Sequence, residues 1–138
     1  MTKLLSQNEV KNLKEGVVSR LRGAKIPYRR FAKLDIRISE YIRECIKHPH
    51  LHNLYELLAI EVFLKKVSRY VLRDEKVRHF ILFYENIKLP SSEGMVSFSL
   101  TPVQVFQFTN IFWFYHDDGE RRVVRDVLLF VPRKFSKT

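Results

Sequence analysis

The stretch that decides the interpretation of this sequence closes it: Leu128-Leu129-Phe130-Val131-Pro132-Arg133-Lys134-Phe135-Ser136-Lys137-Thr138. An apolar run of β-branched and aromatic residues leads into a short basic turn that ends in lysine and threonine. This is the order of a phosphate-binding loop: a buried strand, a turn of backbone N–H groups, a lysine for the phosphates and a hydroxyl for Mg²⁺. Val131 and Ser136 stand where the usual pattern has glycine. A solvated chain end is the competing interpretation, and the residues upstream favour the loop.

Length and composition indicate a globular domain or a part of one. The chain has 138 residues, of which 46% are apolar and 13% aromatic, enough for a real core. The net charge of +10 is unevenly distributed, since residues 1–50 hold 12 lysines and arginines against five acidic residues. Such a basic N-terminal part favours an anionic partner, most simply nucleic acid. Charge that serves solubility alone is the alternative.

The single cysteine and the lack of long apolar runs indicate the cellular compartment. Cys45 has no second cysteine to pair with, which suits a reducing cytoplasm. Its position on the apolar face of a predicted helix indicates a buried core residue. Residues 1–7 lack the apolar core of a signal peptide, and no apolar run is long enough to span a membrane. We therefore expect an intracellular, soluble protein with no membrane partner.

Hydrophobic periodicity predicts that residues 1–95 form a helical lobe. Ser6 and Glu9 have the spacing of a capping box and open a first helix. Apolar residues that recur three and four positions apart predict the helices that follow. Basic side chains on the other faces of the second helix fit contact with nucleic acid or an acidic partner as well as they fit ordinary solvation. The predicted helices run from Ser6 to about Gly23, over 28–47, over 51–72, and from about residue 75 to a point before Pro90.

The run His48-Pro49-His50-Leu51-His52 has the histidine content of a metal site. Pro49 breaks the preceding helix, and the sequence shows no cysteine or carboxylate at a recognised ligand spacing from these histidines. We therefore expect a turn that contains histidines by chance.

A change of organisation is expected near residue 95. Leu89-Pro90-Ser91-Ser92-Glu93-Gly94 is the clearest linker signal in the sequence. Residues 95–100 then alternate like a short strand. These features divide the chain into residues 1–95 and residues 96–138.

Several signals for the start of a helix coincide over residues 101–104. Thr101 is a favoured N-cap residue. Pro102 takes the first helical position and Gln104 the capping-box position. The helix is apolar nearly all round and should be buried on several sides. A turn is expected over residues 116–120, either at the end of this helix or as a hairpin on Asp118-Gly119. Residues 123–131 predict a strand, and its distal part is continuously apolar, as expected of a strand buried on both faces of a parallel sheet.

The order of these segments resembles the opening of the large terminase subunit of tailed bacteriophages, a motor with an ATPase domain followed by a nuclease. The likeness covers residues from about 73 to 138. It rests on Leu-x-Pro-x-Gln-x-Phe at 100–106, Asn-Ile-Phe-Trp-Phe at 110–114, Asp-Gly-x-Arg-Arg at 118–122 and Pro-Arg-Lys-x-x-Lys-Thr at 132–138. Three family residues are replaced: a tryptophan by Val103, an asparagine by Phe135 and the loop glycine by Ser136.

The resemblance implies a mostly α chain, in which a helical N-terminal lobe (1–95) leads into the first helix, first strand and phosphate loop of an incomplete P-loop α/β ATPase domain (96–138). It implies that Gln104 reads the adenine edge of ATP, although the capping-box role of Gln104 is equally well supported. Lys137 is implied to contact the β- and γ-phosphates, and Thr138 to bind Mg²⁺. Arg133 and Lys134 match the basic pair that stabilises charge on the γ-phosphate during catalysis.

The implied function is ATP-driven movement of double-stranded DNA into a procapsid, in the cytoplasm of an infected or lysogenic bacterial host. ATP and Mg²⁺ are the implied cofactors, and the small terminase subunit and the portal are the implied protein partners. The chain holds neither the acidic Mg²⁺-binding strand nor the nuclease carboxylates of that family. We therefore expect it to be inactive alone, as an excised piece, an interrupted gene product or a remnant.

Two readings from other classes remain open. One is a self-standing basic helical module that binds nucleic acid or a partner protein without catalysis. The other is a purely structural part that docks to another component of the packaging machinery.

Overall fold

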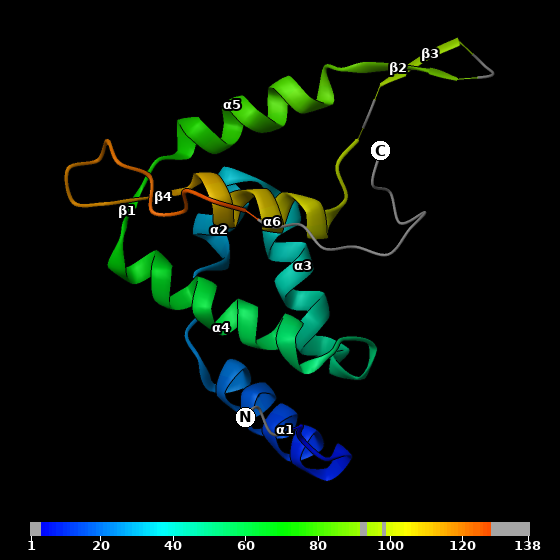
Figure 1. Ribbon diagram of the computed structural model, residues 1–138, viewed down its shortest axis with the longest axis vertical. Helices are drawn as coiled ribbons and strands as arrows, with labels where there is room; N and C mark the ends of the chain where they lie inside the picture. Colours follow the sequence, from blue (N-terminus) through cyan, green and yellow to red (C-terminus); the bar gives the residue numbers. More distant parts are fainter. Residues whose placement is uncertain (1–3, 92–93, 98, 128–138) are drawn as a thin grey trace.

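The computed structural model describes residues 4–91, 94–97 and 99–127, and these are mostly helical, as predicted (Figure 1). Within the described residues the helices are α1 (Gln7–Gly23), α2 (Tyr28–Leu34), α3 (Ile36–Lys47), the 3-10 helix η1 (Pro49–Leu51), α4 (Leu54–Arg69), α5 (Asp74–Glu85) and α6 (Pro102–Phe112). The short strands are β1 (Val71–Leu72), β2 (Lys88–Ser91), β3 (Gly94–Ser97) and β4 (Phe114–Tyr115). None of the helices in this described part is both long and apolar enough to cross a membrane.

The capped helix starts predicted from the sequence are confirmed. Ser6 Oγ accepts a hydrogen bond from the backbone N–H of Glu9 (3.1 Å) at the start of α1. At the start of α6, the Gln104 N–H donates to Thr101 Oγ1 (3.4 Å), and the Thr101 N–H donates to Gln104 Oε1 (2.9 Å). This reciprocal pair is a complete capping box, which satisfies two backbone donors that the helix itself leaves without partners.

The prediction of a single helix over 28–47 is wrong, because the helix is interrupted at Asp35 and forms α2 and α3. The backbone of Asp35 is extended (φ −162°), and its side chain accepts a hydrogen bond from the Arg37 N–H (3.0 Å). A short carboxylate that satisfies a backbone donor in this way favours a helix start over a helix interior. Phe31 and Ile38, on either side of the break, are nevertheless both fully buried in the core. The apolar periodicity therefore continues through a break that it does not reveal.

The helix predicted over 51–72 is too long at both ends. It begins after η1 and ends at Arg69, and the residues beyond it form β1. β1 pairs antiparallel with β4, with Val71 opposite Tyr115 and Leu72 opposite Phe114. This pairing across more than forty residues is a tertiary contact, which a local pattern does not report.

The linker predicted at 89–94 is instead part of a β-hairpin. β2 pairs antiparallel with β3, with Lys88 opposite Ser97 and Ser91 opposite Gly94. Gly94 has a φ of +103°, a conformation that glycine adopts at little cost. The extended segment predicted after residue 95 is confirmed for the residues that β3 covers.

A single hydrophobic core connects the helices (Figure 1). α1 packs on α4, α2 on α3, and α6 lies between α3 and α5. Phe63 of α4 is at the centre, with ring centroids 5.2 Å from Phe31, 4.9 Å from Phe106 and 5.9 Å from Trp113. The described residues on both sides of position 95 thus contribute to the same core. The division of the chain at that position stays a prediction.

α6 is less enclosed than its apolar sequence predicts. It buries Val105, Phe106 and Thr109, but Val103 is 37% exposed. After α6 the chain enters β4 and turns back on itself. Arg122 forms an antiparallel β-bridge with Tyr115, and the Val123 N–H donates to the Phe114 carbonyl (3.0 Å). The hairpin alternative for residues 116–120 is therefore confirmed.

The strand predicted over 123–131 is not present in its described part. Residues 123–127 form no strand, and the rest of the prediction lies outside the described residues. The first strand of a P-loop α/β sheet is accordingly not confirmed.

Candidate functional site

Of the residues predicted to bind ATP and Mg²⁺, Gln104 is described by the structure, whereas Arg133, Lys134, Lys137 and Thr138 lie outside the described residues. Gln104 is half-buried, and its Oε1 accepts the hydrogen bond of the capping box. No described residue accepts a hydrogen bond from its Nε2 amide group. The amide is therefore fixed in direction by the cap and still has donors to offer a ligand.

An ion pair holds the start of α6 in place. Arg37 of α3 donates to Glu85 of α5 through Nη1 (2.8 Å) and to the carbonyl of Leu100 (3.1 Å). Glu85 also accepts a hydrogen bond from the Leu100 N–H (3.0 Å). The hydrogen bond from Arg37 is the main cause that lowers the pKa of Glu85. α3 and α5 thus position the segment that presents Gln104.

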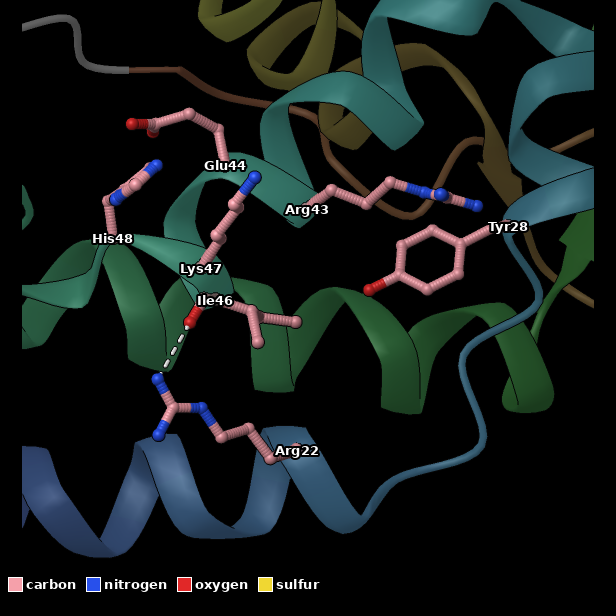
Figure 2. Close-up of a pocket in the computed structure, with 7 residues that line it drawn as sticks. All are labelled: Arg22, Tyr28, Arg43, Glu44, Ile46, Lys47 and His48. Carbon is pink, nitrogen blue, oxygen red and sulfur yellow. Dashed lines mark hydrogen bonds between the residues drawn. The ribbon is translucent and has the colours of Figure 1, made fainter.

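A basic pocket lies between the C-terminal ends of α1 and α3 (Figure 2). Figure 2 shows Arg43 and Lys47 projecting from α3 and Arg22 from α1, with the Arg43 side chain beside the ring of Tyr28. We call this surface the basic pocket; its lining residues are Arg22, Tyr28, Arg43, Glu44, Ile46, Lys47 and His48.

Two contacts order the side chains of the basic pocket. The Arg43 guanidinium carbon lies 4.3 Å from the centre of the Tyr28 ring, a cation–π geometry. Arg22 donates through Nη2 to the carbonyl of Ile46 (3.2 Å), which ties α1 to the last turn of α3. Partial burial raises the pKa of the Tyr28 hydroxyl, against the opposing effect of Arg43, so the ring is neutral at physiological pH. The pocket therefore offers an aromatic face flanked by fixed positive charge.

The positive charge of the basic pocket is not neutralised by nearby carboxylates. Within the part of the chain that the structure describes, Arg22, Arg43 and Lys47 form no ion pair. Glu44, the acidic residue of the lining, instead contacts His52. Cations also stabilise the C-terminal end of a helix, which gives Lys47 a structural role as well. The pocket nonetheless presents cations without ion-pair partners among the described residues, the chemistry that contacts with phosphates need.

Sequence reasoning located the basic region but not the pocket. The excess of positive charge over residues 1–50 indicated an anionic partner. It did not indicate that Arg22 meets residues of α3, because that contact depends on how α1 lies against α3. The sequence predicts that Tyr28 begins a helix. It does not predict the cation–π contact between the Tyr28 ring and Arg43.

Comparisons of this chain with family models, curated proteins and solved structures gave no match.

Proposed function

We propose that the chain is the N-terminal portion of a DNA-packaging ATPase of the terminase large-subunit kind, and that it contributes part of the ATP site. The observation that carries this proposal is the order of motifs from Leu100 to Thr138. A capped helix with glutamine at its third position is followed by an Asp-Gly turn with two arginines and by a basic Lys-Thr end. Two structural findings support it: the capping box at Gln104 and the turn at Gly119, whose φ is +68°.

Gln104 has the chemistry that adenine recognition needs. A side-chain amide presents a donor and an acceptor side by side, which matches the N6 and N7 edge of adenine. The capping hydrogen bond takes one lone pair of Oε1, and a carbonyl oxygen has two. In this proposal Lys137 contacts the phosphates, Thr138 binds Mg²⁺, and Arg133 and Lys134 stabilise the charge on the γ-phosphate.

In the complete enzyme, Gln104→Ala should weaken ATP binding roughly 10- to 100-fold, because the loss of a two-point amide contact is worth about 1–3 kcal/mol. Titration calorimetry with ATP and Mg²⁺ measures this affinity, and thermal unfolding measures stability. Thr101→Ala is the matched control, since it removes the hydroxyl half of the same capping box and keeps the amide. It should lower stability without changing ATP affinity. Unchanged ATP affinity in Gln104→Ala would leave this residue only its capping role.

The basic pocket favours a second candidate function. In this function the chain is a helical module that binds the phosphates of nucleic acid and catalyses no reaction. The supporting observation is that Arg22, Arg43 and Lys47 line one pocket and have no ion-pair partner among the described residues. The two candidates are compatible, since a packaging motor also contacts double-stranded DNA. They differ in whether the basic pocket acts without an ATPase domain.

Arg43→Ala combined with Lys47→Ala should weaken binding to a short DNA duplex and lower its dependence on salt. Each phosphate contact removed should reduce the slope of log K against log salt by about 1. Fluorescence anisotropy over a range of salt concentrations measures both quantities. Lys88→Ala is the control, because Lys88 is an exposed lysine of β2 that does not line the basic pocket. Equal slopes for the double variant and the control would remove the basic pocket as a binding surface.

A further inference from the structure

A mixed cluster of ligand atoms lies where α3 meets η1 and α4. A carboxylate oxygen of Glu44, the sulfur of Cys45 and a ring nitrogen of His52 are all within 4.8 Å of one another. Cys45 is fully buried, as predicted, while the side chain of His52 is 15% exposed and that of Glu44 44% exposed. The turn of η1 folds the chain back and places His52 beside the end of α3. The cluster is therefore half inside the core and open to solvent on the Glu44 side.

His52 is held at both ring nitrogens. Its Nδ1 lies 2.5 Å from Glu56 Oε2 on the first turn of α4, and its Nε2 contacts Glu44 Oε2. An imidazole hydrogen-bonds to two carboxylates as a donor only when both nitrogens carry protons. A metal ion at Nε2 would replace one proton and leave the Nδ1–H donating to Glu56. A carboxylate that holds a ligating histidine by its other nitrogen is the usual support of a metal site.

We propose that Glu44, Cys45 and His52 bind a zinc ion, with Glu56 and Tyr41 as supporting hydrogen-bond partners. A nitrogen, a sulfur and an oxygen ligand suit zinc, which binds histidine, cysteine and carboxylates in tetrahedral sites. Ligand atoms in such a site are about 3.3–3.8 Å apart. His52 Nε2 and Glu44 Oε2, which are in direct contact, must therefore separate to admit an ion, and the cluster as a whole lies within 4.8 Å, so the side-chain movements needed are small. Water can supply the fourth ligand from the exposed side of Glu44. This proposal is independent of the ATPase proposal.

The charges around the cluster also favour a divalent cation. In the absence of a metal ion, the carboxylates of Glu44 and Glu56 both contact the one imidazole ring of His52. With zinc bound, the Glu44 carboxylate and the Cys45 thiolate balance its two charges, and protons leave the thiol and His52 Nε2. Burial raises the pKa of the Cys45 thiol to about 11, against the opposing effect of a hydrogen bond with Tyr41, so the metal ion itself must displace the thiol proton. Zinc would then fasten the end of α3 to the start of α4 beside the basic pocket, which Glu44 also lines.

The wild-type protein, without an affinity tag and kept reduced, tests the proposal. Titration calorimetry should show one zinc ion bound per chain, and zinc should raise the thermal unfolding midpoint. Cobalt(II), which replaces zinc in such sites, should give a thiolate-to-cobalt charge-transfer band. Cys45 is the one cysteine, so this band reports its ligation directly. A folded wild-type protein that binds no zinc, or that gives no such band, overturns the proposal.

Variants locate the ligands. Cys45→Ser and His52→Gln should abolish the stoichiometric site, whereas Glu56→Gln should weaken zinc binding about 10- to 100-fold and keep the cobalt band. His50→Gln is the matched control, because His50 belongs to η1 in the same turn and contacts His48 rather than the cluster. It should bind zinc as the wild type does. Equal zinc affinity in a folded Cys45→Ser variant, or loss of binding in His50→Gln, contradicts the assignment.

Discussion

Trp113→Ala should lower the free energy of unfolding by about 3–5 kcal/mol, the usual cost of truncating a fully buried large aromatic residue. Trp113 follows α6 directly and is fully buried. Its ring stacks on Phe63 of α4 at 5.9 Å and meets the edge of Phe31 of α2 at 6.1 Å. Its Nε1 donates to Asp74 Oδ1 (2.7 Å) at the start of α5. One side chain therefore joins four helices, and its loss leaves a cavity that none of them can fill alone.

Chemical denaturation monitored by circular dichroism measures this loss. Phe83→Ala is the control, since Phe83 is an aromatic residue of α5 that is 63% exposed. Its substitution should change the stability by no more than about 0.5 kcal/mol. Similar losses for the two variants would show that the segment after α6 is not part of the core.

Asp74→Ala should lower the free energy of unfolding by about 1–3 kcal/mol, because it leaves a buried donor without an acceptor. Asp74 accepts hydrogen bonds from Trp113 Nε1 and from both terminal nitrogens of Arg30, at 2.9 and 2.7 Å. Asp74→Asn is the control that keeps one acceptor oxygen for Trp113 while it removes the charge and one of the two oxygens that accept from Arg30. It should be destabilised less than Asp74→Ala. Equal stability of wild type and Asp74→Ala would contradict this account of the contact.

The same carboxylate should make stability depend on pH. Burial opposes ionisation of Asp74, but the hydrogen bonds from Arg30 and Trp113 outweigh it and lower its pKa. A group whose pKa is lower in the folded state stabilises the fold above its unfolded pKa of about 3.9. This contribution is lost as the pH falls through the lower folded value. The stability difference between wild type and Asp74→Asn should therefore narrow as the pH falls below about 4, and a constant difference would contradict the assignment.

The features predicted correctly from the sequence are those that local chemistry determines. Ser6 and Thr101 cap helices because a hydroxyl before an apolar run satisfies nearby backbone donors. Cys45 was placed in the core because it falls on an apolar helical face, and it is buried. These predictions need only residues a few positions apart, and they hold without knowledge of the rest of the fold.

The features that were missed depend on contacts between distant segments or on competing local patterns. The break at Asp35 was hidden because Phe31 and Ile38 keep the helical spacing on both sides of it. The sequence does not indicate that the side chain of His52 meets those of Glu44 and Cys45. The turn of η1 nevertheless brings His52 to Cys45, seven positions earlier, with Glu44 beside it. Sequence spacing identifies metal sites of known pattern, whereas this cluster depends on how α3 meets α4.

The proposed ATP site is formed by residues near the end of the sequence. The proposed nucleic-acid surface, the basic pocket, is formed by residues near its beginning. Both include an anionic ligand, since ATP and DNA each present phosphates. The helical core links the two regions, because α3 lines the basic pocket with one end and holds the start of α6 through Arg37. If both proposals hold, the helical lobe contacts DNA while Gln104 faces a nucleotide.

The most direct test of the central proposal is the intact mass of the native protein purified from its source, together with the coding sequence after the Thr138 codon. The proposal predicts a longer polypeptide, in which a helix follows Thr138 with its N-terminus toward the phosphates and an acidic strand comes later. A native mass of 16.6 kDa, the mass of this chain, with a stop codon after Thr138, would contradict the ATPase proposal. The basic pocket would then be the functional surface to examine.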